Sequence, residues 1–243
     1  MSLALQLYTL RDHLDSDLND TLKRVADIGY TQVEPYRIVS DTFELGAALR
    51  EHGLSVPTAH APLLSVEQEA IFAAATQLGI GTLILPATPQ EMWTTAADVI
   101  EIATELNNAA RAAAEHGLRV GYHNHWWEFA PIDERTAMEH FADLLHPDVV
   151  LEVDTYWAAV AGVDPVQVIT TLGERVQYLH LKDGPITREP ADQVALGQGR
   201  MPVSQILRAA AHLRLGVVEL DDHRGDMFTA VEQSLAYLSA GDR

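Results

Sequence analysis

An apolar, strand-like run followed by a helical pattern recurs eight times along the 243 residues of this chain. The strand-like runs cover residues 3–10, 31–35, 55–62, 81–86, 119–125, 149–157, 177–184 and 215–222. Helical spacing follows at residues 17–29, 41–53, 66–79, 94–117, 134–145, 165–172, 203–214 and 227–240. Strands that alternate with helices form parallel sheets, and eight units of about thirty residues match the smaller (β/α)8 barrels. We therefore predict an α/β fold, a (β/α)8 TIM barrel.

The alternative arrangement is an open, doubly wound sheet. It is disfavoured because no G-x-G-x-x-G follows the first strand, and because polar residues end nearly every strand rather than one switch point. No Pro-, Gly- or Ser-rich linker divides the sequence, so residues 1–243 are predicted to form a single domain. The longest irregular segment, residues 183–202, is interpreted as a functional loop after the seventh strand.

The charge balance excludes several classes of partner. Sixteen Lys and Arg against thirty-five Asp and Glu give a formal net charge of -19, which repels nucleic acid and anionic membranes. The N-terminus has no basic, cleavable leader, and no apolar run approaches the length of a membrane span. We expect a soluble cytoplasmic protein that binds neither nucleic acid nor membrane. Because cysteine is absent, any metal must be held by His, Asp or Glu.

The chemically informative residues are the polar ones that end the apolar runs, because barrel active sites form at the carboxyl ends of the strands. Asp154, His180 and Glu219 come from three successive strands and suit a divalent cation such as Mn²⁺, Mg²⁺, Co²⁺ or Zn²⁺. A strand alternates faces with period two, so His180 and Lys182 should share a face. The same holds for the other polar strand-end pair, which is His123 and His125.

Other strand-end residues leave alternatives open. Glu34 and His60 could bind sugar hydroxyls or pair with each other, and Gln6 is a weaker candidate of the same kind. In the segment GYHNHWWEF, His125 or Glu128 could relay a proton, and an unligated His125 would produce a pH limb near neutrality. Trp126 and Trp127 could belong to the core or to a subunit interface, or they could form a wall on which a sugar ring stacks. Asp221 and Asp222 are expected to be solvated or to cap the last helix. Gly197 and Gly199 could form a plain turn or let the backbone approach the substrate.

Taken in order, QLYTLRD, VEP, YHNHWWEF, LEVDTYWA, HLKDG, LGQG and VELD resemble the xylose isomerase-like superfamily of sugar phosphate isomerases and epimerases. The resemblance implies a barrel that binds a divalent metal and acts on sugars, keto-sugars or inososes. It makes Asp154, His180 and Glu219 metal ligands. Trp157 is a further candidate for substrate contact. The fourth ligand departs from the ketose epimerase pattern, since His123 stands where a glutamate both binds metal and moves a proton. Lys182, His125 or Glu128 would then have to join Glu219 as catalytic groups.

The implied first step is removal of a carbon-bound proton beside a carbonyl, with a metal ion stabilising the enediolate. Its continuation gives a sugar isomerase or epimerase, or alternatively a lyase of the inosose dehydratase type. A non-catalytic sugar-binding barrel and an apurinic endonuclease-like nuclease are weaker alternatives, the nuclease because of the net charge of -19. The expected partner is a small carbohydrate, neutral rather than phosphorylated because few Lys or Arg end the strands. A homodimer would suit the tryptophans near the site.

Overall fold

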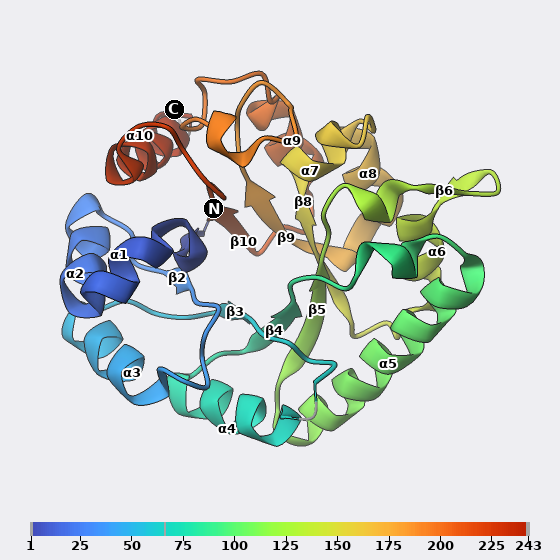
Figure 1. The fold of residues 1–243 in the computed structure, drawn as a ribbon, viewed down its shortest axis with the longest axis horizontal. Helices are drawn as coiled ribbons and strands as arrows, with labels where there is room; N and C mark the ends of the chain where they lie inside the picture. The colour runs from blue at the N-terminus through green and yellow to red at the C-terminus, as the bar shows by residue number, and fades with distance from the viewer. Residues whose placement is uncertain (1, 66, 242–243) are drawn as a thin grey trace.

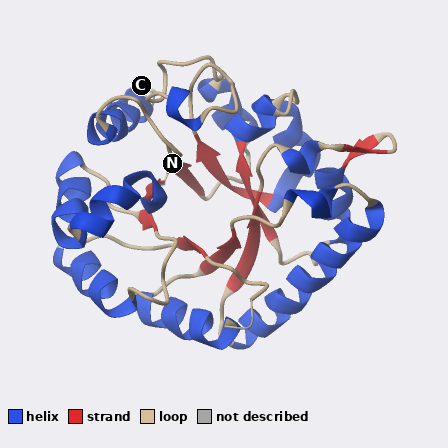
Figure 2. Cartoon of the chain, in the orientation of Figure 1, coloured by secondary structure: helices blue, strands red, loops and turns tan. Residues whose placement is uncertain are grey.

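The computed structural model describes residues 2–65 and 67–241, and these form a ring of helices around a central sheet (Figures 1 and 2). Residues 1, 66 and 242–243, which belong to the predicted domain and include the first residue of the helix predicted over 66–79, lie outside the described residues. The strands of the central sheet are β1 (Leu3–Gln6), β2 (Val33–Glu34), β3 (Thr58–His60), β4 (Thr82–Leu85), β5 (Arg119–His123), β8 (Val150–Asp154), β9 (Val176–Leu181) and β10 (Leu215–Val218).

These eight described strands are all parallel and follow the order β2-β1-β10-β9-β8-β5-β4-β3. The remaining gap between β2 and β3 is bridged by backbone contacts. Val33 N–H donates to Ser55 O at 2.9 Å, and His60 N–H donates to Pro35 O at 2.9 Å. The prediction of a (β/α)8 TIM barrel is therefore confirmed, with a nearly closed sheet.

The helices cover the outside of the sheet, as crossovers between parallel strands require. They are α1 (Arg11–Ser16), α2 (Leu18–Ile28), α3 (Thr42–Glu51), α4 (Gln68–Leu78), α5 (Ala96–Glu115), α6 (Ala137–Leu144), α7 (Thr155–Val160), α8 (Pro165–Leu172), α9 (Val203–Ala209) and α10 (Met227–Ala240). The last helix contacts the first units, because Tyr30 Oη donates to Val231 O and the Arg24 guanidinium stacks on Phe228. Among the described residues, every helix is too short or too polar to cross a bilayer.

Two predicted strands end earlier than their apolar runs, and short helices follow. The first strand stops at Gln6, whose side chain accepts a hydrogen bond from Tyr8 N–H and starts the 3-10 turn η1 (Leu7–Leu10) that leads into α1. The run at 149–157 stops at Asp154, which accepts from Trp157 N–H and caps α7. Each side chain accepts a hydrogen bond from a backbone N–H two or three residues later, so the chain turns into a helix there instead of continuing as a strand. The predictions of strand over 7–10 and 155–157 are wrong for this reason.

A small hairpin replaces the start of the helix predicted over 134–145. Strands β6 (Pro131–Ile132) and β7 (Arg135–Thr136) pair antiparallel, and Asp133 adopts a positive φ of 53° in the turn. Helix α6 begins only at Ala137, where Thr136 and Glu139 form a reciprocal capping box. The helices predicted over 165–172 and 227–240 are confirmed at both ends.

The interior of the barrel has an apolar layer below a polar one. Alternation along each strand carries the pattern: Val150, Glu152 and Asp154 share one face of β8, as do Tyr178 and His180 on β9. The apolar layer is a buried cluster of Ala4, Ile84, Val150, Tyr178, Leu215 and Val217. A Cβ at Gly121 would lie 2.6 Å from Ile84 Cδ1, so this position needs glycine for the layer to close. The polar layer above it carries the candidate site.

Candidate active site

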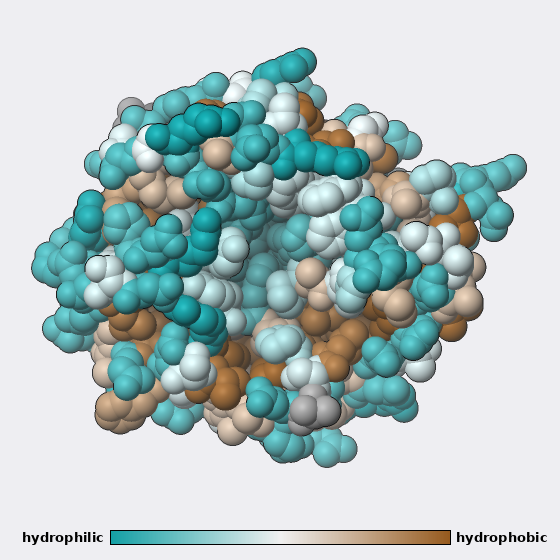
Figure 3. Space-filling model, viewed as in Figure 1, coloured by the Kyte–Doolittle hydropathy of each residue, from teal (hydrophilic) through white to brown (hydrophobic). Residues whose placement is uncertain are grey.

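A cavity of about 320 Å³ opens at the carboxyl ends of the strands, where Figure 3 shows a hydrophilic hollow at the centre of the molecule. Its lining combines aromatic, small apolar and titratable residues: Tyr8, Tyr36, His60, Ala61, Pro62, Pro86, Ala87, His123, His125, Glu219 and Asp221. A second cavity of about 330 Å³ lies on the outer wall between α6 and α8, and its described lining contains none of the predicted site residues. Chemistry rather than volume therefore identifies the candidate site.

The structure brings together the four residues predicted to bind metal, from the ends of four neighbouring strands. They are His123 on β5, Asp154 on β8, His180 on β9 and Glu219 directly after β10. All four are buried, and one donor atom from each lies within 4.8 Å of the others. Two metal–ligand bonds of about 2.0–2.3 Å span nearly this distance. The His/Asp/Glu donor set is one that a first-row divalent ion accepts.

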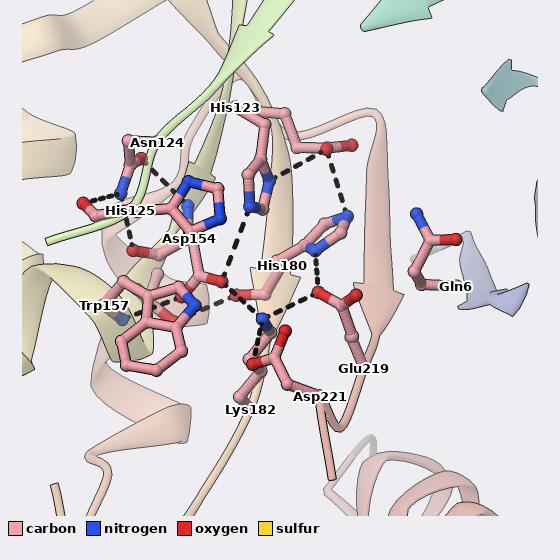
Figure 4. A network of polar contacts seen from close by, with 12 residues as sticks. Gln6, His123, Asn124, His125, Asp154, Trp157, His180, Lys182, Glu219 and Asp221 are labelled. Carbon is pink, nitrogen blue, oxygen red and sulfur yellow. Dashed lines mark hydrogen bonds and ion pairs between the residues drawn. The ribbon is translucent and has the colours of Figure 1, made fainter. Parts of the chain in front are cut away.

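Lys182 lies among the same carboxylates (Figure 4). Its Nζ is 2.9 Å from Asp154 Oδ2, 2.8 Å from Glu219 Oε2 and 2.7 Å from Asp221 Oδ2. Three carboxylates thus meet one ammonium, which leaves negative charge for a further cation to balance. Asp154 Oδ2 is buried and accepts no hydrogen bond, so its main neighbour is the Lys182 ammonium. This surplus of buried negative charge fits a divalent ion.

The pKa values follow from this burial and charge. Burial raises the pKa of Asp154 to about 6, although Lys182 opposes the shift. For Glu219, burial alone would raise the pKa, but Lys182 and His180 hold it well below its usual range. Burial would lower the pKa of Lys182, and the surrounding carboxylates instead raise it well above its usual range. At neutral pH the site therefore presents an ionised Glu219 beside a protonated Lys182.

Below this cluster, Glu34 and Glu152 face three imidazoles. Glu152 Oε2 lies 2.7 Å from His60 Nε2, 3.0 Å from His180 Nε2 and 3.2 Å from His123 Nδ1. Glu34 Oε1 lies 3.2 Å from His60 Nε2, so the predicted pairing of Glu34 with His60 is present. Glu34 Oε1 also accepts from Gln6 Nε2 at 2.8 Å. His60, His123, Glu152 and His180 form a second buried group whose ligand atoms lie within 4.8 Å of one another.

His125 lies at the mouth of the cavity, above His123. Its ring stacks on Trp127 with centroids 4.3 Å apart, and its Nδ1 has no hydrogen-bond partner. Burial and the nearby charge of Lys182 lower the pKa of His125 to about 3. The predicted pH limb near neutrality from this residue is therefore not supported, because the imidazole is neutral throughout the physiological range. A neutral imidazole beside the cavity can accept a hydrogen bond from a substrate hydroxyl, but a pKa this low makes it a weak base at neutral pH.

Glu128 holds the loop that carries His125. Its carboxyl contacts Tyr122 Oη at 2.8 Å and accepts from His125 N–H at 2.8 Å. Burial raises the pKa of Glu128 to about 8. Glu128 is not among the described residues that line the cavity, and its Oε1 lies 4.0 Å from His125 Nδ1. Its predicted part in proton transfer is therefore an indirect one.

Three residues predicted to contact substrate lie behind the cavity wall instead. Gln6, Glu34 and Trp157 are buried and are not among the described lining residues. Trp157 packs beside Lys182, whose Nζ is 5.5 Å from the centre of the Trp157 ring. Trp126 and Trp127 are half-buried and pack edge to face, so neither forms an open stacking wall in the described lining.

Three further residues belong to this site although the sequence pattern did not assign them to it: Glu152, Asp221 and Tyr36. Glu152 lies two positions before Asp154 on β8, and strand alternation could have placed both carboxylates on one face. Asp221 was expected to be solvated or to cap the last helix, but it pairs with Lys182 and accepts from Gln193 Nε2 at 2.7 Å. The N-cap of α10 is Asp226. No local pattern signals Tyr36, which meets the cavity from the segment after β2.

The loop over 183–202 is organised by one buried carboxylate. Asp183 accepts hydrogen bonds from the backbone N–H groups of Gly184, Gly197, Gly199 and Met201 at 2.8–3.1 Å. The LGQG segment therefore forms a turn around Asp183, as the plain-turn alternative for Gly197 and Gly199 predicts. Gly197 has a φ of 83°, and a Cβ there would collide with the Tyr237 ring. Gln193 of this loop joins it to Asp221 at the cavity.

Comparison with known proteins adds relatives to this geometry. A family model described as Xylose isomerase-like TIM barrel matches residues 22–240. An inosose dehydratase from Geobacillus kaustophilus is 24% identical over 200 residues, which are 72% of this chain and 64% of that protein. A 2-epi-5-epi-valiolone 7-phosphate 2-epimerase from Actinoplanes sp. is 28% identical over 184 residues, 74% of this chain and 64% of that protein. The matches thus span under two thirds of the length of these curated relatives.

The fold has close structural neighbours. A solved structure of a sugar phosphate isomerase/epimerase from Parabacteroides distasonis superposes with a TM-score of 0.85 at 24% identity. The superposition covers 98% of this chain and 93% of that one. At this identity the likeness establishes the barrel fold.

Proposed function

Because this chain belongs to the xylose isomerase-like TIM barrel family, we propose that it is a divalent-metal-dependent isomerase or epimerase of a small sugar. The observation that carries the proposal is the convergence of His123, Asp154, His180 and Glu219 beside a cavity at the barrel mouth. Mn²⁺, Mg²⁺, Co²⁺ or Zn²⁺ held by these four residues would supply Lewis-acid polarisation of a carbonyl and its neighbouring hydroxyl.

The proposed proton transfers use three side chains of this site. Glu219 lines the cavity and its pKa is held low, after burial, by Lys182 and His180, so its free oxygen can accept a carbon-bound proton. Lys182 keeps its proton among three carboxylates, behind the described cavity lining, and would offset negative charge on the substrate through its neighbours Glu219 and Asp221. His125 presents a neutral imidazole at the cavity wall and, because its pKa is low, would hold a proton only transiently while it passes between substrate oxygens. Glu128 positions His125 through its backbone N–H.

The proposed substrate is a neutral keto-sugar or polyol. Among the described residues that line the cavity there is no Arg or Lys, while Glu219 and Asp221 are acidic. A phosphate group would meet these carboxylates without a facing cation, which costs free energy in a partly desolvated site. Tyr8 and Tyr36 pack edge to face on the cavity wall, with their ring centroids 5.3 Å apart, and offer apolar surface to a sugar ring.

A dehydratase is the second candidate function. The observation that favours it is the buried ammonium of Lys182 beside Glu219, because its positive charge would stabilise a departing β-hydroxyl close to the base that removes the proton. The similarity to an inosose dehydratase points the same way. The acidic lining of the cavity gives no support to a nuclease, because it would repel a phosphate backbone. The lowered pKa of Glu219 and the raised pKa of Lys182 are typical of a catalytic site rather than of a non-catalytic binding site. The homodimer and the cytoplasmic location stay predictions.

One experiment separates these activities. Purified protein with added Mn²⁺ is incubated in D₂O with a panel of neutral ketoses and inososes and with their phosphorylated counterparts, and proton NMR follows each mixture. An isomerase or epimerase exchanges a carbon-bound proton and yields a sugar of unchanged mass, whereas a dehydratase yields a product lighter by one water. Asp154→Asn is the matched inactive control. Absence of exchange and turnover across the neutral panel would contradict the proposal.

A further inference from the structure

We propose that Glu152 is a positioning residue that determines which ring nitrogen of His123 and of His180 faces the metal-binding carboxylates. The inference rests on the proposed metal site and deepens it, because it assigns a role to a carboxylate that binds neither substrate nor metal in that proposal. Glu152 lies on β8, fully buried, with its side chain on the same face as Asp154. Among the described residues, Glu152 is the only acidic residue whose side chain contacts three imidazole rings.

A single oxygen of Glu152 makes these contacts. Oε2 lies 2.7 Å from His60 Nε2, 3.0 Å from His180 Nε2 and 3.2 Å from His123 Nδ1, while Oε1 is buried with no hydrogen-bond partner. An ionised carboxylate can only accept hydrogen bonds, and even a protonated one could donate to one nitrogen. This oxygen is hydrogen bonded to His60 Nε2 and His123 Nδ1, whereas His180 Nε2 is hydrogen bonded to Glu34 and meets Glu152 as an ion-pair contact. The carboxylates below the rings therefore favour hydrogen on His123 Nδ1 and on His180 Nε2.

The opposite nitrogens point at the proposed metal ligands. His123 Nε2 faces Asp154 Oδ2 at 3.8 Å, and His180 Nδ1 faces Glu219 Oε2 at 2.6 Å. A neutral imidazole has one N–H and one lone pair, so a hydrogen held on one nitrogen leaves the other nitrogen free to bind an ion. Without a bound ion, His180 Nδ1 also carries a hydrogen for its contact with the ionised Glu219, and an ion bound at Nδ1 would replace that hydrogen. Metal-binding histidines commonly donate their second ring N–H to a carboxylate in this way, which fixes the ring orientation. Glu152, together with Glu34 at His180, thus turns His123 Nε2 and His180 Nδ1 toward the proposed metal ligands Asp154 and Glu219.

Glu34 supports the same arrangement from the other side of the barrel. Its Oε1 lies 2.8 Å from His180 Nε2 and accepts from Gln6 Nε2 at 2.8 Å. The contact holds His180 between two carboxylates below the ring and Glu219 above it. His60 stacks on His180 with centroids 5.1 Å apart and planes 6° from parallel, so Glu152 also fixes the ring that covers His180.

An alternative reading makes Glu152 itself a ligand, together with His60, His123 and His180, whose donor atoms also lie within 4.8 Å of one another. The two readings use opposite nitrogens. In the proposed arrangement the ion binds His123 Nε2 and His180 Nδ1, whereas an ion on Glu152 would bind His123 Nδ1 and His180 Nε2. The identity of the coordinating nitrogens therefore decides between them without any variant.

The first test uses the wild-type chain loaded with Zn²⁺, a diamagnetic probe. Long-range proton–nitrogen NMR correlations of ¹⁵N-histidine-labelled protein identify which ring nitrogen binds the ion and which carries hydrogen. We expect coordination through Nε2 of His123 and Nδ1 of His180. Coordination through the opposite nitrogens overturns the role given to Glu152 and leaves the metal-dependent function standing. Failure of the wild-type protein to bind Zn²⁺ overturns both.

The second test measures Zn²⁺ affinity by competition with a chelator. Glu152→Gln keeps the volume of the side chain but loses the charge, and affinity should fall by about 10–100-fold. Tyr178→Phe is the matched control, because it removes a buried 3.0 Å hydrogen bond to Thr82 two residues before His180 on β9. The control should change affinity by less than about twofold. Equal affinities of Glu152→Gln and wild type would overturn the proposal, and if Glu152→Gln does not fold, the coordinating nitrogens in the wild type decide.

Discussion

Lys182 Nζ lies 2.9 Å from Asp154 Oδ2, so an internal ammonium and the proposed metal ion share one carboxylate. Glu219 is shared in the same way, at 2.8 Å from Lys182 Nζ. Two cations close to the same oxygens repel each other, yet three carboxylates around one ammonium remain short of positive charge. Replacing Lys182 therefore tests whether repulsion between the two cations or the excess of carboxylates controls metal binding in this site.

Lys182→Met should retain bound Mn²⁺ and lose turnover by about 10²–10⁴-fold, because the group that stabilises developing charge is gone. Without metal the variant should be less stable by about 3–5 kcal/mol, since three buried carboxylates lose their partner. Added Mn²⁺ should raise its melting temperature more than that of the wild type. Metal content, steady-state rates and thermal unfolding test this. Unchanged turnover would remove Lys182 from the mechanism.

Asp154→Asn should lose bound metal and turnover while the fold survives, and Glu219→Gln should do the same. Asn at position 154 can still accept the hydrogen bond from Trp157 N–H that caps α7. The loss of metal affinity should exceed the roughly 10–100-fold cost of removing an outer-sphere partner. The matched control is Asp164→Asn, which changes the N-cap of α8 away from the cavity. Wild-type metal content in Asp154→Asn or Glu219→Gln would exclude that residue as a ligand.

Glu128 should impose a pH dependence on stability. Burial raises its pKa to about 8 from an ordinary value near 4.5, so the folded chain holds a proton that the unfolded chain releases. This contribution to the free energy of unfolding is fully present below about pH 4.5 and is lost as pH rises through about 8. Urea denaturation at several pH values should show a steeper decline for the wild type than for Glu128→Gln.

The control for this experiment is Glu51→Gln, at an exposed position of α3, which should keep the wild-type pH slope. If Glu128→Gln and the wild type declined equally between pH 5 and 8, the raised pKa of Glu128 would be refuted.

Asp183→Asn should destabilise the loop over 183–202. One carboxylate oxygen accepts from Gly197 and Gly199, the other from Gly184 and Met201, and an amide NH₂ cannot accept. Each buried backbone donor left without an acceptor costs about 1–3 kcal/mol. The control is Asp192→Asn, whose ion pair with Arg224 is partly exposed and should contribute about 0–1 kcal/mol. Denaturant midpoints that moved equally in the two variants would contradict this account.

Most of the barrel could be predicted because its signals are local. Periodicity and helix caps depend on residues a few positions apart, so the helices over 165–172 and 227–240 were found at both ends. The short helix α7 and the hairpin β6–β7 were missed because a capping side chain, Asp154 or Thr136, overrides the preference of the run around it. The composition of a run indicates its preference for strand, but it does not show whether a side chain within the run will cap a helix instead.

The candidate site was predictable where chemistry falls at the end of an apolar run, as it does for Asp154, His180 and Glu219. Glu152 was missed because it lies inside such a run, although its spacing from Asp154 carried the signal. The roles of Asp183 and Asp221 depend on partners distant in sequence, such as Gly197 and Gln193, which no local pattern identifies. The low pKa of His125 likewise arises from burial, which only the folded structure supplies.

The most direct test of the central claim is a crystal structure of the protein grown with Mn²⁺, with anomalous scattering measured to locate the ion. We predict one anomalous peak per chain, within coordinating distance of His123 Nε2, Asp154, His180 Nδ1 and Glu219. A barrel mouth without such a peak at saturating Mn²⁺, or a peak bound only to residues outside this set, would contradict a metal-dependent sugar enzyme at this site.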